Sequence, residues 1–120
     1  MIYDKKINST LSEHFRVEEF HCHCKREVCH YTLIDHNIVF ALESLRLLTK
    51  CPLIIASAFR CQLHNIDSTG VPKSKHTIGK AADLLRPEHI NWSKFIEMAN
   101  DCFDVVIPYK KANFIHCHNN

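Results

Sequence analysis

A ten-residue segment near the middle of the chain, residues 74–83, constrains its fold more than any other feature. The segment reads Ser-Lys-His-Thr-Ile-Gly-Lys-Ala-Ala-Asp, so it holds an imidazole, His76, and a carboxylate, Asp83. Gly79, one of only two glycines in the chain, lies between them. A glycine at this place suits a backbone with positive φ or a close approach of two backbone segments. The segment therefore predicts a tight turn between His76 and Asp83.

The apolar residues on both sides of Asp83 predict that this carboxylate lies at or within a short buried strand. A buried carboxylate is costly unless a cation or a metal ion compensates its charge. Further imidazoles come late, in the sequence Phe-Ile-His-Cys-His over residues 114–118. Two histidines and one carboxylate, with a fourth position left to water, are the ligand set of a catalytic zinc site, whereas structural sites are usually closed by four Cys or His ligands. The alternative is that His76 caps a loop and Asp83 caps a helix or a strand.

The segment matches the pattern S-x-H-x-x-G-x-A-x-D without a mismatch, and it thereby resembles the signature of metallopeptidase family 15. That family holds zinc D-Ala-D-Ala carboxypeptidases, vancomycin-resistance D,D-dipeptidases, phage endolysin peptidases and the hedgehog signalling domain. Flanking segments are similar to its short, single-domain subgroup, and they extend the resemblance over residues 11–118. They are residues 11–20, 54–60, 103–107 and 114–116.

The resemblance implies an α+β fold in which helices pack on an antiparallel sheet, as in the hedgehog domain and the D-Ala-D-Ala peptidases. It implies a zinc ion held by His76, Asp83 and His116. His116 rather than His118 corresponds to the last ligand of the family, because it follows the aromatic and apolar residues of the family's ending.

Two further residues take roles from the resemblance. Arg60 resembles the family arginine that stabilises the developing oxyanion or holds a substrate carboxylate. Ser74 would orient His76 or donate a hydrogen bond to the substrate. The alternatives are that Arg60 is a surface arginine and that Ser74 is an ordinary turn hydroxyl.

The general base is where the sequence departs from the family. Several members carry Glu or Asp a few residues before the last histidine ligand, where this chain has Lys110, Lys111 and Asn113. Short relatives often carry Asp or Ser two residues after that ligand, where this chain has His118. An imidazole can act as a base near neutral pH, so His118 is the first candidate and Asp104 the second. Alternatively, His118 is a frayed terminal residue.

The composition indicates that residues 1–120 form one compact domain. Hydrophobic residues make up 46% of the chain, which argues against disorder. A net charge of only +2 argues against a nucleic-acid partner, and no stretch has the apolar length that spans a bilayer. The first residues lack the apolar stretch of a secretory signal. We therefore expect a monomer, synthesised in the cytoplasm and released to the cell wall by a phage- or holin-type route.

Seven cysteines are many for 120 residues. Their odd number and the missing signal argue against disulfides, so we expect most to be reduced thiols. Cys51, Cys61 and Cys102 flank apolar segments and are expected to be small core residues. Residues 21–30 contain several possible metal ligands close together, and a second, structural zinc ion is conceivable there. Its ligands would be Cys22, Cys24, Cys29 and His30. The C-x-C-x4-C-H spacing is not a standard zinc knuckle, so the alternative is a solvated loop.

Apolar periodicity predicts a helix over residues 33–49, with Phe40 and Leu47 widening its apolar face enough for burial on two sides. Pro52 ends this helix. The other predicted elements are a strand over 53–59, a loop over 67–75, a helix over 88–102, and strands over 105–107 and 113–118 joined by a turn.

The sequence therefore favours a zinc D,D-carboxypeptidase or endopeptidase that acts on peptidoglycan stem peptides, in the manner of a phage endolysin. A second hypothesis is a hedgehog-like pseudo-peptidase that keeps the zinc ion without turnover. A third is a rolling-circle nicking enzyme, with His116 and His118 as the metal pair and Tyr109 as nucleophile. The third is the weakest, because no helix carrying a tyrosine follows the two histidines.

Overall fold

A computed structural model describes residues 1–68 and 70–120. Over these residues the chain forms the helices α1 (His36–Thr49), α2 (Gln62–Asp67) and α3 (Trp92–Asn100). The strands are β1 (Ile2–Asp4), β2 (Tyr31–Leu33), β3 (Ile55–Ser57), β4 (Ala81–Leu85), β5 (Val105–Tyr109) and β6 (Phe114–His118). Short 3-10 turns are η1 (Val17–Phe20), η2 (Lys75–Ile78) and η3 (Lys110–Ala112). None of the described helices is long and apolar enough to cross a membrane.

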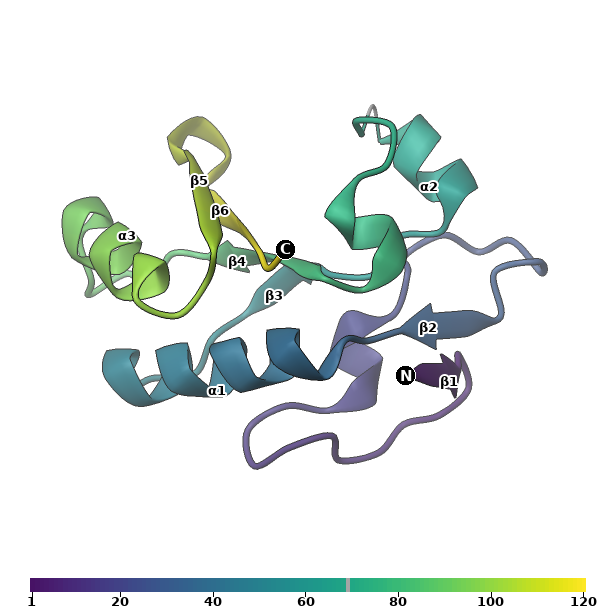
Figure 1. Cartoon of the computed structure of the whole chain (residues 1–120), viewed down its shortest axis with the longest axis horizontal. Helices are drawn as coiled ribbons and strands as arrows, with labels where there is room; N and C mark the ends of the chain where they lie inside the picture. The colour runs from purple at the N-terminus through teal and green to yellow at the C-terminus, as the bar shows by residue number, and fades with distance from the viewer. Residues whose placement is uncertain (69) are drawn as a thin grey trace.

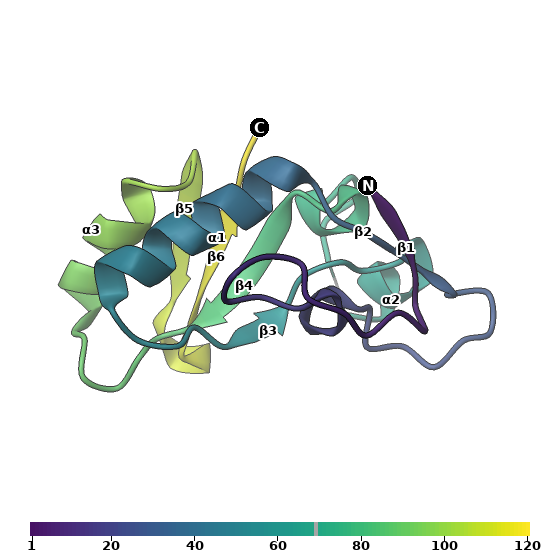
Figure 2. The ribbon, with the colours of Figure 1, turned by 90° about the horizontal axis from the view of Figure 1, so that it is seen from below.

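Four strands form an antiparallel sheet in the order β3-β4-β6-β5, and β1 and β2 form a separate antiparallel pair (Figure 1). Helix α1 crosses the sheet with α3 beside it, while α2 and η2 lie near the other end of the sheet (Figures 1 and 2). This arrangement confirms the predicted α+β class.

Side chains along β4 and β6 point alternately to the two faces of the sheet, which places apolar and ionisable groups on opposite faces. Ala82 and Leu84 of β4, with Ile115 and Cys117 of β6, are fully buried in the core that also holds the inner faces of α1 and α3. Successive strand residues point to opposite faces, so the side chain of Asp83 points away from this core. One face of the sheet is therefore apolar, and the other is free to carry a site.

The helices begin later than periodicity predicts, because polar caps decide where they start. In α1 the Asp35 carboxylate accepts a hydrogen bond from the Asn37 N–H at 2.7 Å, just after the chain leaves β2. In α3 the Asn91 side-chain oxygen accepts from the Lys94 N–H at 2.8 Å. Both C-terminal strands are confirmed, and Pro108 is tolerated within β5 because that strand lies at the sheet edge.

The loop predicted over residues 67–75 is confirmed only in part. Helix α2 extends to Asp67, η2 begins at Lys75, and residue 69 lies outside the described residues. The sequence did not predict α2, whose six residues are too few to show helical periodicity.

The prediction that Phe40 and Leu47 are buried is wrong. Their side chains are 78% and 68% exposed. The opposite face of α1 supplies the core residues Ile38, Leu42 and Leu45. Helix α1 meets the sheet and α3 on one side only, so within the described part of the chain its outer face packs against no second layer.

Candidate metal centre

The turn between His76 and Asp83 depends on Gly79. Its φ is +75°, and a Cβ atom built on it would lie 2.4 Å from the Leu33 carbonyl oxygen. The Gly79 carbonyl also accepts a hydrogen bond from the Asp35 N–H at 3.0 Å. The predicted positive φ and the predicted close backbone approach are both confirmed, and together they seat the turn against the segment that leads into α1.

His76 belongs to η2, and its side chain is fully buried. Its Nδ1 lies 2.5 Å from the Ala58 carbonyl oxygen, which can only accept, so Nδ1 carries the proton and Nε2 presents a lone pair. The Ser74 hydroxyl oxygen accepts a hydrogen bond from the His76 backbone N–H at 3.2 Å. Ser74 therefore caps the turn that holds His76, as the alternative of an ordinary turn hydroxyl predicts.

Three possible ligand atoms converge from three elements. His76 Nε2 lies 3.1 Å from Asp83 Oδ1 and 3.2 Å from His116 Nδ1, and the latter two atoms are 3.1 Å apart. Asp83 and His116 are direct partners across the β4–β6 ladder, and η2 brings His76 against them. A tetrahedral ion with bonds of about 2.0–2.1 Å holds its ligand atoms about 3.3 Å apart. The spacing of these three atoms therefore fits one metal ion.

The charge of the site also fits a cation. Burial alone raises the pKa of Asp83, but His116 and His76 within hydrogen-bond reach outweigh burial and lower the pKa to about 2. The carboxylate is thus ionised at neutral pH. A largely buried negative charge beside two imidazoles suits a bound cation.

His118 lies on the same face of β6 as His116, as the period of a strand predicts. Its Nδ1 is 2.8 Å from His116 Nε2. Burial, together with the positive charges of His116 and Lys75, lowers the pKa of His118 below its ordinary value. His118 pairs with Ala81 in one neighbouring strand and Val105 in the other, so it is not a frayed terminal residue.

The three atoms lie in a pocket of about 540 Å³ that also receives three basic side chains, those of Arg60, Lys73 and Lys75. The Arg60 backbone N–H donates to the His76 carbonyl at 3.1 Å, which ties the arginine to η2. Its buried Nε has no hydrogen-bond partner among the described residues. Arg60 is half-buried and lines the pocket, so it is not a fully exposed surface arginine.

Sequence reasoning missed part of the pocket wall. Tyr109 and Phe114 stack with ring centroids 4.9 Å apart and line the pocket from β5 and β6. Lys73 and Lys75 come from the segment before His76. A flexible basic side chain in a loop carries no periodic signal, and only the fold shows that it faces a site.

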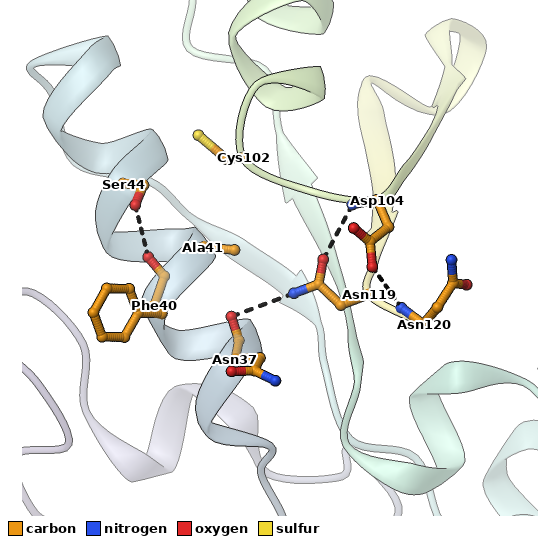
Figure 3. A pocket seen from close by; sticks show the side chains of 8 residues that line it. All are labelled: Asn37, Phe40, Ala41, Ser44, Cys102, Asp104, Asn119 and Asn120. Atoms are coloured by element: carbon orange, nitrogen blue, oxygen red, sulfur yellow. Dashed lines mark hydrogen bonds between the residues drawn. The ribbon is translucent and has the colours of Figure 1, made fainter.

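Asp104, the second candidate for the base, does not line this pocket. Its carboxylate accepts a hydrogen bond from the Asn120 N–H at 2.9 Å, and its own N–H donates to the Asn119 side-chain oxygen at 3.1 Å. These residues border a different hollow, beside the outer part of α1 (Figure 3). The structure therefore does not bring Asp104 to His76 and His116.

A second group of possible ligands gathers at the segment 21–30, as the sequence suggested, but one of its members comes from outside that segment. The sulfurs of Cys22, Cys24, Cys29 and Cys61 all lie within 4.8 Å of one another. Cys61 replaces the predicted His30, whose side chain is exposed. Cys61 packs against the small cluster of Cys22, Cys29 and Phe59, and Cys51 and Cys102 pack against the main core, as expected for small core residues.

Comparison with known proteins agrees with the geometry. The model of a family described as Peptidase M15 matches residues 13–118, which is nearly the whole chain. A search of curated proteins finds no match. The family match favours a peptidase over the nicking enzyme. By the extent of this match, the chain belongs to the peptidase M15 family.

Proposed function

We propose that this protein is a zinc D,D-peptidase that hydrolyses D-amino-acid-containing peptide bonds in bacterial peptidoglycan. The observation that carries the proposal is the convergence of His76, Asp83 and His116, with ligand atoms 3.1 to 3.2 Å apart, in a pocket lined by basic side chains. Family membership supports the peptidase class. The substrate class and the role as a phage lysis enzyme rest on the resemblance of residues 74–83 to cell-wall peptidases.

Zinc held by His76, Asp83 and His116 would supply Lewis-acid polarisation of a carbonyl and activation of water at neutral pH. The chain's own residues prepare that site. The Ala58 carbonyl fixes the tautomer and the orientation of His76. His118 accepts from His116 Nε2–H in the arrangement that leaves His116 Nδ1 free to bind the metal.

Arg60 is the residue we assign to the substrate. Its guanidinium charge and its place in the pocket suit either the developing negative charge on the scissile carbonyl or a substrate carboxylate. Lys73 and Lys75 add positive charge to the same pocket. A stem peptide that ends in a free carboxylate would therefore be attracted to this face.

His118 is the residue we assign as proton acceptor. Outside the three converging ligands, it is the only imidazole among the described residues that line the pocket. Its lowered pKa keeps the ring neutral near pH 7, which is the form a base requires. To take a proton through Nδ1, the ring must give up its contact with His116.

One observation favours the pseudo-peptidase. Among the described residues that line the pocket, Asp83 is the only carboxylate, so the usual acidic base has no equivalent. This alternative keeps the metal centre and removes turnover.

The test is digestion of purified muropeptides, followed by mass spectrometry, with and without a chelator. We expect release of D-alanine or cleavage of cross-links, loss of activity with the chelator, and recovery on addition of zinc. His116→Ala should lack activity and the zinc ion of this centre. A wild-type protein with one zinc ion in this centre and no turnover favours the pseudo-peptidase, and activity that survives complete metal removal contradicts the proposal.

A further inference from the structure

Four of the seven cysteines meet at one place, away from the pocket described above. The sulfurs of Cys22, Cys24, Cys29 and Cys61 lie within 4.8 Å of one another, and the sulfurs of Cys24 and Cys61 are 3.6 Å apart. A tetrahedral zinc ion with four Zn–S bonds of about 2.3 Å holds its sulfurs about 3.8 Å apart. We propose that these four thiolates bind a second, structural zinc ion.

The ligands come from two separate segments. Cys22, Cys24 and Cys29 belong to residues 21–30, which contain neither helix nor strand. Cys61 comes from the start of α2, where its sulfur accepts a hydrogen bond from the His64 N–H at 3.4 Å. The four residues between Cys24 and Cys29 fall within the interval typical of paired zinc ligands.

Hydrogen-bond donors surround the sulfurs. The Cys61 N–H donates to Cys22 Sγ at 3.4 Å, and the Lys5 ammonium group donates to Cys29 Sγ at 3.4 Å. Lys5 also donates to the Cys24 carbonyl at 2.7 Å, which anchors it beside the sulfurs. Donors of this kind stabilise metal thiolates and orient them. The charge of Lys5 offsets part of the negative charge that four thiolates leave on a divalent ion.

The local core is too small to account for the order of residues 21–30. Its buried members are Cys22, Cys29 and Phe59, with Cys24, Tyr31, Leu33 and Cys61 packed against them. Cysteines are thus the majority of this cluster, and they offer little apolar surface. A metal ion at their centre would supply the cross-links that a ladder of backbone hydrogen bonds supplies elsewhere.

The zinc ion would act on the pocket through the chain. Arg60 lies between Phe59 and Cys61 in the chain. The Phe59 N–H donates a hydrogen bond to the Phe20 carbonyl at 3.1 Å. A metal ion bound by Cys61 would therefore hold the corner from which Arg60 enters the pocket. This consequence rests on the proposed function, whereas the metal site itself does not.

Cobalt(II) titration of the reduced, metal-free full chain tests the site. Thiolate ligands give cobalt an intense charge-transfer band in the near ultraviolet, and the ligands His76, Asp83 and His116 cannot give one. We expect one equivalent of cobalt per chain to develop the band. His116→Ala should keep it, Cys24→Ser should lose it, and Cys102→Ser, in a cysteine outside the cluster, should keep it.

Zinc analysis separates this proposal from the peptidase proposal. We expect two zinc equivalents in the wild type and one each in His116→Ala and Cys24→Ser. If His76, Asp83 and His116 bind no zinc but the four cysteines do, the wild type will contain one zinc equivalent and will still give the cobalt band. Because Cys24→Ser can fail to fold, a mercurial thiol reagent added to the folded wild type gives a second test, and it should release one zinc equivalent.

Two results overturn the proposal. One is the absence of a thiolate band when cobalt is added to the reduced wild type. The other is a purified protein in which peptide mapping by mass spectrometry shows that these four cysteines are joined in two disulfides instead of a metal site.

Discussion

At the scale of the residue, Gly79 meets two demands at once, a positive φ and a backbone neighbour 2.4 Å from any added Cβ. In Gly79→Ala the side chain disfavours the positive φ and also collides with the neighbouring backbone. In Gly79→Asn the residue tolerates the positive φ, and only the collision remains. We expect both variants to lose about 2 kcal/mol or more of unfolding free energy and to bind less zinc. Urea unfolding and metal analysis measure these effects. An asparagine variant as stable as the wild type would show that φ alone requires the glycine.

Arg60 can be tested without disturbing the metal centre. Arg60→Lys keeps the positive charge and loses the planar array of donors. We expect normal zinc content and a loss of about 10²-fold in muropeptide turnover, by analogy with removal of one oxyanion donor. Arg16→Lys, in an exposed arginine outside the pocket, is the control. Equal activity of Arg60→Lys and wild type would leave Arg60 with a structural role.

His118→Ala separates proton transfer from ligand orientation. If His118 is the base, the variant keeps its zinc and loses turnover, with a fall of about 10² to 10⁴-fold in kcat. If His118 mainly orients His116, zinc affinity falls about 10 to 100-fold. Turnover and zinc affinity are therefore measured on the same preparation. If turnover and zinc affinity both equal those of the wild type, His118 neither accepts the proton nor orients His116.

At the scale of the element, Glu43 joins α1 to the segment that precedes η1. Its carboxylate accepts hydrogen bonds from the Ser12 hydroxyl at 2.5 Å and from the His14 N–H at 2.8 Å. Burial alone raises the pKa of Glu43, but these hydrogen bonds outweigh burial and lower the pKa below its ordinary value. The carboxylate therefore stabilises the folded chain only while it is ionised.

The sign of the resulting pH dependence follows from the lowered pKa. The stabilisation is complete above the unfolded-state pKa of about 4.3 and disappears as the pH falls through the lower folded-state value. We expect Glu43→Gln to cost about 1 kcal/mol at pH 7 and progressively less below pH ~4.3. Urea unfolding over that range measures it, with Glu97→Gln as the control in an exposed ion pair. A difference that stays constant down to pH ~2 would contradict this role.

At the scale of the whole molecule, bound metal should dominate the stability of a chain this short. A ligand bound only by the folded state adds about 4 kcal/mol when its concentration is a thousand times its Kd. We expect a chelator to lower the Tm of the wild type by roughly 10 °C or more. His116→Ala should still respond to the chelator, because the four thiolates retain their own ion. A wild-type Tm that is unchanged by complete metal removal would mean that neither site stabilises the fold.

Residues 74–83 carried most of what the sequence could predict. The spacing of His76, Gly79 and Asp83 is set by one local turn, so the printed order of residues already contains it. The same holds for the common face of His116 and His118, which follows from the two-residue period of a strand. Local periodicity also located α1 and both C-terminal strands, although caps moved the helix starts.

Only the tertiary structure decided which distant groups meet. Cys61 joins Cys22 through contact between α2 and the segment 21–30, and no local pattern distinguishes it from a core cysteine. Burial of Phe40 depends on whether a second layer covers α1, which periodicity cannot show. Asp104 lies near His118 in sequence, yet its partners hold it at another hollow. A turn or a strand face is determined by neighbours along the chain, whereas a shared site is determined by packing between elements that the sequence keeps apart.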